Sequence, residues 1–281
     1  MQTVKLACEL PALHGLPVSQ WDCTELARAL VESGVTRAIS PDTVRRILVS
    51  HELRPWRVHA WLSPRVARDQ TFAAAVKVIC DLYTRLLADS EAVICVDEKT
   101  SLQPRPRRAP SLPAEAGKPV RVEHGYKRAG ALHLFAAFNT RSGDVLAKTE
   151  PRKRAEEFIA FLDYLDSQIS PGLTTIHVVL DNLIVHKSKA VAAWLKLHPR
   201  FQFHFPPIHC SWLNQVEQWF SILQRKLLRH PNFPDLAALA RAIEAFVARW
   251  NRLAQPFNWT TGSVTKVMAK CQLPEGLSAN A

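Results

Sequence analysis

The chain of 281 residues contains 36 Lys and Arg against 25 Asp and Glu, which gives a formal net charge of +11. It lacks both the apolar run of roughly eighteen residues that a membrane span needs and the start of a secretory signal, so a cytoplasmic protein is expected. The six cysteines show no spacing typical of zinc sites or disulfide frameworks.

The excess of positive charge favours a polyanionic partner, of which nucleic acid is the commonest, with a solubilising surface as the alternative. The charge is concentrated in one part of the chain. Residues 99–154 contain thirteen Lys or Arg and four Asp or Glu, which leaves +9 on this segment. We therefore expect a DNA-facing surface there.

Near the N-terminus, apolar residues recur at helical spacing within 22–53 and predict two short helices. Gly34 follows the first helix as a C-terminal glycine, while Ser40 and Pro41 are typical of the start of the second. The arrangement suits a helix-turn-helix, although such helix pairs are common in all-α domains. The second helix has three outward-facing residues suited to DNA contacts: Thr43, Arg45 and Arg46.

Helical periodicity continues within 55–90, after which strands and helices alternate. Strands are expected at 91–97, 131–139, 144–150, 174–181 and 201–205. Helices are expected at 155–169, 189–198, 211–229 and 235–252. A loop rich in Pro and Arg, 103–119, interrupts the order. The order predicts an α/β mixed sheet with flanking helices, compatible with a ribonuclease-H-like fold, while other α/β orders stay open.

Three acidic residues stand at informative places in this pattern. Asp97 ends an apolar strand in "VICVDEK", and Asp181 ends another in "IHVVLDN". After thirty-five intervening residues, Glu217 borders the apolar stripe of the helix predicted at 211–229. A single Asp at a strand end is usually a turn former or a helix cap. The conjunction of all three instead predicts a carboxylate cluster.

Clustered carboxylates repel one another and need a divalent cation to neutralise them. Two Mg²⁺ ions about 3.5–4 Å apart would activate a water or a 3′-hydroxyl and stabilise the leaving oxygen in a phosphodiester displacement. Hard oxygen ligands favour Mg²⁺ or Mn²⁺ over zinc. Side chains alternate along a strand, so Asp97 and Glu98 should not both face this site.

Four segments carry a specific resemblance: "VDEKTSLQPRPR", "HGYKRAGALHLFAAFNTRSGDVL", "VLDNLIVHKSKAVAAWL" and "HCSWLNQVEQWFSIL". Together they resemble the DDE transposases of the IS630 type, relatives of Tc1/mariner elements, over roughly residues 90–260. Residues 20–62 resemble the second DNA-binding subdomain of that family. The chain begins where the first helix-turn-helix subdomain of such transposases would end, which would make it a shortened copy.

The resemblance implies that Asp97, Asp181 and Glu217 bind two Mg²⁺ or Mn²⁺ ions. It also implies a nucleoid-associated homodimer that acts on double-stranded DNA, cuts element ends and joins 3′-hydroxyls to target DNA, typically at TA. Further phosphate contacts are expected from a basic group: Arg105, Arg107, Arg108, Lys127 and Arg128. Three auxiliary candidates have structural hydrogen bonding or loop packing as an alternative role: Asn182, His186 and His209.

Four parts of the chain are expected: a helix-turn-helix or winged-helix-like domain at 1–65, a helical connector at 66–90, a ribonuclease-H-like catalytic domain at 91–260 and a tail at 261–281. Two other functions stay open. One is a nuclease of the same fold that hydrolyses nucleic acid without strand transfer. The other is an inactive remnant that only binds DNA.

Overall fold

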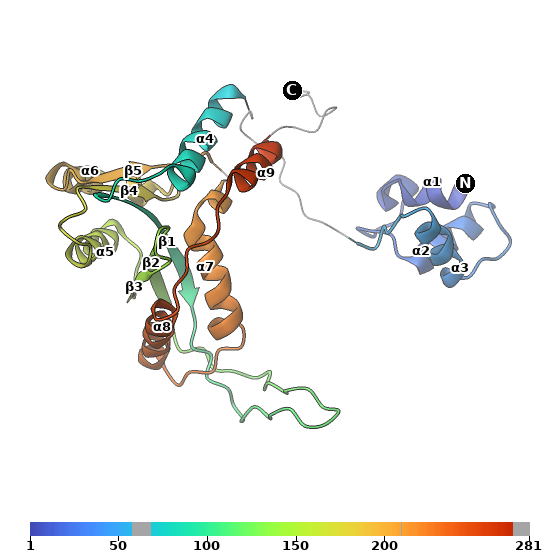
Figure 1. Ribbon diagram of the computed structural model, residues 1–281. Helices are drawn as coiled ribbons and strands as arrows, with labels where there is room; N and C mark the ends of the chain where they lie inside the picture. Colours follow the sequence, from blue (N-terminus) through green and yellow to red (C-terminus); the bar gives the residue numbers. More distant parts are fainter. Residues whose placement is uncertain (58–68, 209, 272–281) are drawn as a thin grey trace. The chain divides into compact units, whose positions relative to one another are not determined.

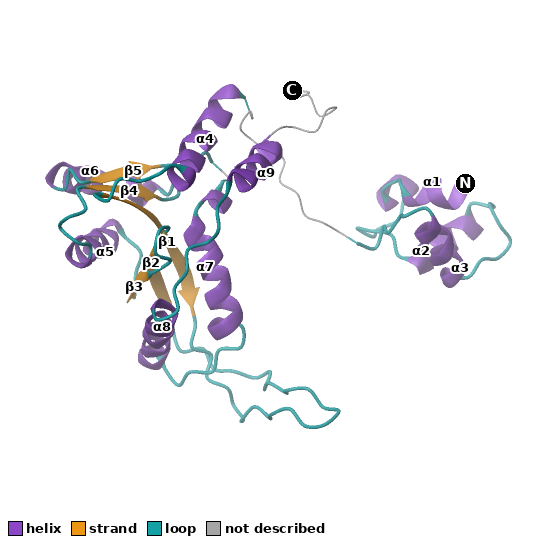
Figure 2. Cartoon of the chain, in the orientation of Figure 1, coloured by secondary structure: helices purple, strands orange, loops and turns teal. Residues whose placement is uncertain are grey.

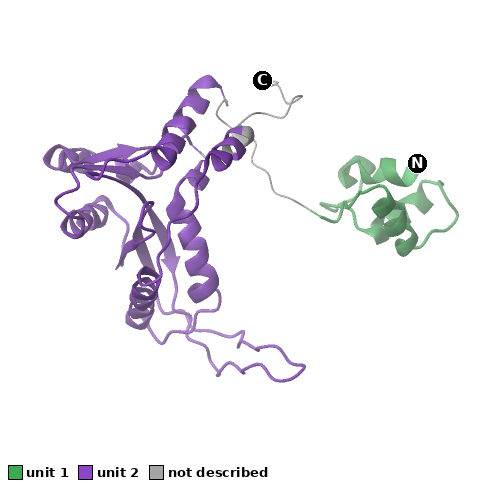
Figure 3. Cartoon of the chain, viewed as in Figure 1, with its two compact units in different colours: residues 1–63 green, residues 64–281 purple. Residues whose placement is uncertain are grey.

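The computed structural model describes residues 1–57, 69–208 and 210–271. The chain divides into two compact units, residues 1–63 and 64–281 (Figure 3). The expected domain boundary after residue 65 falls within 58–68, outside the described residues. Each unit contains its own cluster of buried apolar side chains.

Over residues 1–57, the first unit contains three α-helices and one 3-10 helix: α1 (Gln2–Ala7), Pro11–His14, α2 (Cys23–Glu32) and α3 (Pro41–Ser50). The two helices predicted within 22–53 are confirmed. Ser40 caps α3 by accepting a hydrogen bond from the backbone N–H of Thr43, and Gly34 adopts a φ of +71° just after α2. Their apolar faces meet in a small core around Trp21, Leu26 and Leu48.

The second unit is built on a five-stranded mixed sheet with the order β3-β2-β1-β4-β5 (Figures 1 and 2). β1 pairs antiparallel with β2 and parallel with β4. The strands are β1 (Glu91–Leu102), β2 (Leu132–Asn139), β3 (Val145–Glu150), β4 (Thr175–Val179) and β5 (Phe201–His204). The helices are α4 (Gln70–Thr84), α5 (Ala155–Gln168), α6 (Lys189–Leu197), α7 (Gln215–Leu223), α8 (Leu236–Asn251) and α9 (Thr261–Cys271).

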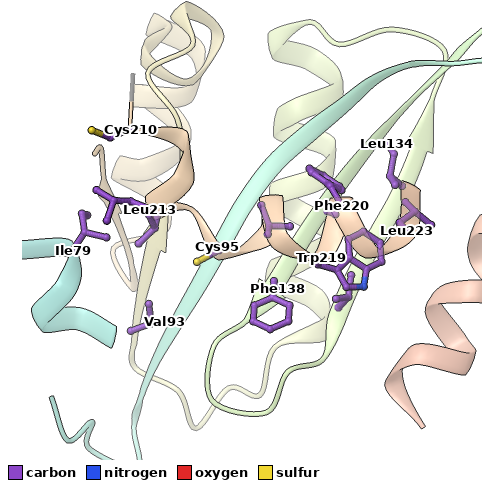
Figure 4. Close-up of a cluster of buried hydrophobic side chains, with 14 of the residues drawn as sticks. Ile79, Val93, Cys95, Leu134, Phe138, Cys210, Leu213, Trp219, Phe220 and Leu223 are labelled. Atoms are coloured by element: carbon purple, nitrogen blue, oxygen red, sulfur yellow. The ribbon is translucent and has the colours of Figure 1, made fainter. Parts of the chain in front are cut away.

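Helices cover both faces of this sheet because β1 is apolar on both faces. Val93 and Cys95 pack against a cluster that includes residues of α4, α7 and α8. Ala92, Ile94 and Val96 pack on the other side with residues of α5 and α6. Figure 4 shows the first cluster, in which α7 contributes three large side chains: Trp219, Phe220 and Leu223. The sheet is therefore the middle layer of three.

Three elements differ from the sequence-based expectation. β1 does not end at Asp97 but continues to Leu102, because β2 supplies pairing partners beyond that residue. The helix expected over 211–229 is divided: a 3-10 turn at Ser211–Leu213 precedes α7, and a π-helical turn at Gln224–Leu228 follows it. The tail expected at 261–281 includes α9. No helix within the described residues has the length and apolar character to span a membrane.

The basic segment between β1 and β2 leaves the sheet as a long loop (Figure 2). Three isolated bridges pair its two limbs, joining Arg107 to Tyr126, Leu112 to Arg121 and Glu115 to Lys118. At its base, the backbone N–H of Arg107 donates to the side chain of Asn232 at 2.9 Å. The loop is therefore an irregular two-stranded extension that is tied to the sheet domain at its base.

The turn between β2 and β3 is fixed against the end of α8. The Trp250 indole N–H donates to the carbonyl oxygen of Gly143 at 2.8 Å, and the Asn251 side chain bonds both backbone groups of Val145 at 2.9 Å. Gly143 has a φ of +79°, and a Cβ atom there would lie 2.2 Å from the backbone of Gln255. Glycine is required here by both backbone conformation and space.

We expect Gly143→Ala to lower the free energy of unfolding of the sheet domain by about 2 kcal/mol or more, from the strained φ together with the backbone clash. Urea denaturation of the full chain would measure this loss. The matched control is Gly172→Ala: Gly172 lacks a positive φ, and a Cβ atom there would meet only Ser170 Oγ at 3.5 Å. Equal stability of the two variants would contradict the assignment.

Candidate active site

The two strand-end aspartates lie at the same edge of the sheet. The parallel pairing of β1 and β4 runs from Glu91 opposite Thr175 to Cys95 opposite Val179. Asp97 and Asp181 each follow this last pair by two residues. The carboxyl ends of adjacent parallel strands meet at one edge, so the strand register places the two aspartates side by side.

Asp97 is the most buried carboxylate of the group, with 6% of its surface exposed. One oxygen accepts from the backbone N–H of Glu98 at 2.7 Å, and the other has a longer contact, 3.4 Å, to the Asn214 amide. Burial, together with the negative charges of Glu217, Asp181 and Glu98, raises the pKa of Asp97 to about 8, and the hydrogen bond from the Glu98 N–H opposes this shift. The protein thus contains a carboxyl group whose charge is costly without a cation.

Glu217 reaches the same region from α7. It lies in the first turn of that helix, half-buried, and its backbone N–H donates to the carbonyl of Asn214 at 3.1 Å. Within the described residues its carboxylate has no hydrogen-bond or ion-pair partner. It lines an open pocket with Ser211, Trp212 and Trp259. Its charge raises the pKa of Asp97, so the two carboxylates lie within electrostatic reach of each other.

Asn214 connects α7 to β1. This N-cap residue is 1% exposed, and its amide N–H₂ donates to the carbonyl of Val96 at 2.9 Å as well as contacting Asp97. Asn214 is not among the predicted site residues, although an Asn three residues before a Glu is a signal for a helix start. Asn214 therefore fixes the beginning of the Glu217 helix against the strand that contains Asp97.

Asp181 is held by two donors that share one of its oxygens. The backbone N–H of Leu183 lies 3.0 Å from Oδ1, and Nδ1 of His186 also lies 3.0 Å from Oδ1. The His186 bond holds the pKa of Asp181 below its usual value, and burial of the carboxyl opposes it. The second oxygen, Oδ2, has no hydrogen-bond partner among the described residues.

Glu98 points away from Asp97 because side chains alternate along β1. Its carboxylate, 4% exposed, lies 2.8 Å from Nε2 of His186. Burial lowers the pKa of His186, but hydrogen bonds to Asp181 and Glu98 outweigh this effect and raise it to about 10. Both ring nitrogens are therefore protonated and donate. The choice of Asp97 over Glu98 as the site-facing acid agrees with this geometry.

The donor set suits a hard divalent cation. Three carboxylates approach one another from β1, from the residues after β4 and from α7. Among the described residues, Oδ2 of Asp181 and both carboxylate oxygens of Glu217 have no hydrogen-bond partner. Carboxylate oxygens are the ligands that Mg²⁺ and Mn²⁺ prefer. In the described part of the chain, no three Asp, Glu, His or Cys side chains are already arranged around one point as ligands. The carboxylates are gathered but not closed around an ion.

Two of the three auxiliary candidates, Asn182 and His186, have defined structural contacts. The Asn182 amide donates to the carbonyl of Pro206 at 2.5 Å and accepts from Lys187 at 2.6 Å, which holds the turn after β4 to the segment after β5. His186 is described above. His209 lies outside the described residues.

The expected DNA contacts lie on separate surfaces. On α3, Arg45 and Arg46 are exposed and pair with Asp42, and Thr43 is half-buried. In the loop after β1, Arg105, Lys127 and Arg128 are exposed, and Arg108 is half-buried. The half-buried Arg107 donates to the carbonyl of Glu123 at 2.9 Å and stacks near Tyr126, so it stabilises the loop itself.

The five-stranded mixed sheet with helices on both faces is a ribonuclease-H-like fold. Residues 92–240 match the family described as DDE superfamily endonuclease, and the chain belongs to that family. The family resemblance expected from the four sequence motifs is confirmed.

Similar proteins point in the same direction. The chain is 25% identical over 240 residues to the insertion element IS630 uncharacterized 39 kDa protein of Shigella sonnei, covering 84% of this chain and 66% of the relative. The chain thus spans just under two thirds of that relative's length. A pre-cleavage Mos1 transpososome has a TM-score of 0.55 at 16% identity, covering 94% of this chain and 77% of that chain. A mariner Mos1 paired-end complex with Mg has a TM-score of 0.53 at 14% sequence identity, covering 89% of this chain and 72% of that chain. The structural likeness establishes the fold.

We expect Asn214→Ala to lower the free energy of unfolding by about 1–3 kcal/mol, because the buried carbonyl of Val96 and the Asp97 carboxyl both lose a donor. Urea denaturation of the full chain would measure the change. Gln218→Ala is the control on the same helix: Gln218 is exposed, so its loss should stay within about 0.5 kcal/mol. An Asn214→Ala variant as stable as the control would contradict the role assigned to this amide.

Proposed function

We propose that the chain is a DNA transposase that cuts the ends of a mobile element and joins 3′-hydroxyls to target DNA. One observation carries the proposal: three carboxylates approach one another. They are a buried aspartate two residues beyond the last β1–β4 pair, a second aspartate at the matching position after β4, and a glutamate in the first turn of α7. Membership in the DDE superfamily endonucleases supports a reaction at a phosphodiester bond.

We assign metal binding to Asp97, Asp181 and Glu217. When bound, two Mg²⁺ or Mn²⁺ ions would supply activation of the attacking oxygen and charge stabilisation of the leaving one. The neighbouring mariner protein Mos1 has structures described as complexes with Mn and with Mg, which supports this choice of ions. Asp97, buried within the sheet, fixes the inner side of the site, while the open oxygens of Asp181 and Glu217 face the substrate side.

We assign DNA binding to two basic surfaces. Exposed Arg45 and Arg46 on α3 are suited to a DNA groove, and Arg105, Lys127 and Arg128 in the loop after β1 are suited to phosphates. Residues 1–65 would then be the DNA-binding domain and 91–260 the catalytic domain, linked through 66–90. The Mos1 paired-end complexes and strand transfer complex support a dimer that holds two DNA ends and joins them to a target.

The first test is cleavage of a DNA duplex that contains the gene's own flanking sequences. In Mg²⁺ or Mn²⁺ we expect cutting by the wild type and a loss of at least about a hundredfold for Asp181→Asn, since even residues behind metal ligands commonly cost 10–100-fold. The matched control is Asp89→Asn, because the Asp89 side chain is fully exposed and, among the described residues, contacts Arg141 alone, at 3.4 Å.

The products decide between the related functions. Joined DNA molecules support a transposase, and free ends alone would indicate a nuclease without strand transfer. DNA binding without metal-dependent cutting would support an inactive DNA-binding protein. Cutting that survives Asp181→Asn would show that the carboxylate assignment is wrong.

A second test uses stability instead of activity. Because the pKa of Asp97 in the folded protein is about 8, above that of an unfolded chain, the wild type loses stability as pH rises from about 4 to about 8. In EDTA we therefore expect Asp97→Asn to gain stability over the wild type between pH 5 and pH 8. Adding Mg²⁺ should raise the melting temperature of the wild type and leave that of the variant unchanged. Thermal unfolding would measure both, and an equal response to Mg²⁺ would argue against a site at Asp97.

A further inference from the structure

His186 has an unusual position beside the carboxylate cluster. It lies in the 3-10 turn Ile184–Lys187, its side chain has no exposed surface, and both ring nitrogens contact carboxylates. Nε2 lies 2.8 Å from Glu98 Oε1. Nδ1 lies 3.0 Å from Asp181 Oδ1 and also 3.3 Å from the Asp181 carbonyl oxygen, so it contacts both the side chain and the backbone of that residue. The Phe158 ring of α5 packs against the imidazole with centroids 4.4 Å apart. The ring is therefore held from three sides.

Glu98 is the anchor of this arrangement. Its side chain lies on the face of β1 opposite to Asp97, is 4% exposed, and has His186 as its only hydrogen-bond partner within the described residues. A buried carboxylate with one partner is costly to leave unpaired. Because β1 is paired on both sides up to Cys95, Glu98 provides a fixed point from which the imidazole can be oriented.

Asp181 lacks such support from its own strand. β4 ends at Val179, and the Asp181 side chain is 37% exposed, so the strand pairing fixes its backbone position more firmly than its carboxylate orientation. The two donors at Oδ1, the Leu183 N–H and His186 Nδ1, turn that oxygen inward and leave Oδ2 open. The orientation of the carboxylate therefore depends on the imidazole.

We propose that Glu98 and His186 are positioning residues that fix the Asp181 carboxylate with Oδ2 presented to a divalent cation. The proposal rests on the proposed function and deepens it, because it explains why an acid is needed next to Asp97 on the face turned away from the site. Partners behind a metal ligand orient the ligand and commonly change metal affinity 10–100-fold when they are removed. The alternative is that His186 only neutralises the buried Glu98 and has no effect on the ion.

The two roles are separated by Mn²⁺ binding to the full chain, measured by titration calorimetry without DNA. We expect His186→Phe, which keeps a ring against Phe158 but has no donor, to weaken Mn²⁺ binding about 10–100-fold. Glu98→Gln keeps an acceptor for His186 and should weaken it by a few-fold at most. The control is His177→Phe, a buried histidine of β4 whose Nδ1 lies 3.0 Å from His204, and it should bind Mn²⁺ as the wild type does.

Weaker Mn²⁺ binding could also result from a variant that does not fold, and this cause has to be excluded. His186→Phe leaves Glu98 without its donor, so the double variant Glu98→Gln with His186→Phe removes the unpaired charge, and thermal unfolding checks that each variant folds. A further readout without metal is the NMR signal of the His186 ring protons. The protons on Nδ1 and Nε2 should both be shifted downfield by hydrogen bonds to carboxylates. Glu98→Ala should remove the downfield shift of the Nε2 proton and leave that of the Nδ1 proton.

Each remaining outcome is decisive. If the His186→Phe variant or the double variant folds and binds Mn²⁺ with the affinity of the wild type, the positioning role is overturned, while the metal site itself stays in place. Ring protons without the downfield shift would overturn the bridge itself. If the wild type and Asp181→Asn both failed to bind Mn²⁺, the metal assignment under the proposed function would be rejected, and the inference with it.

Discussion

The parallel pairing of β1 with β4 is the constraint on which the site depends. Residues distant in sequence are brought into one register, in which Cys95 lies opposite Val179 and the pairing between these two strands ends. Apolar side chains before this point are buried on both faces, so a shift of register by one residue would turn them toward the wrong layer. The hydrophobic core thereby also sets the relative position of Asp97 and Asp181.

The gathered carboxylates work against folding, and local hydrogen bonds offset part of that cost. Asp97 receives a backbone N–H and an amide, while Asp181 receives a backbone N–H and an imidazole. These donors hold the acids apart and in defined orientations without neutralising the whole cluster. The raised pKa of Asp97 shows that an electrostatic cost remains. A divalent cation bound by these carboxylates would remove part of this cost and stabilise the fold.

Much of the fold could be predicted from local patterns. The helix start at Ser40, the glycine after α2 and the two apolar strands before Asp97 and Asp181 depend on neighbouring residues, and the structure agrees with them. The extension of β1 to Leu102 could not be predicted, because residues 98–101 are polar and the pairing beyond Asp97, at Glu98, Lys99 and Leu102, is with β2. The contact between Glu98 and His186 could not be predicted either, because it joins residues 88 positions apart and depends on the β1–β4 register. The alternation of side chains along β1 indicated only that Glu98 faces away from Asp97.

Glu217 is positioned by a different kind of constraint from that of the two aspartates. No strand register reaches α7, so its placement depends on burying Trp219, Phe220 and Leu223 against the sheet (Figure 4). Each such side chain contributes about 1.5–3 kcal/mol when fully buried. Asn214 then fixes the rotation and start of the helix through its bond to Val96. Packing of these side chains supplies the free energy that holds α7 against the sheet, and the Asn214 amide sets where the helix begins and how it is rotated. The position of the Glu217 carboxylate therefore depends both on the core and on a polar contact that the core alone could not specify.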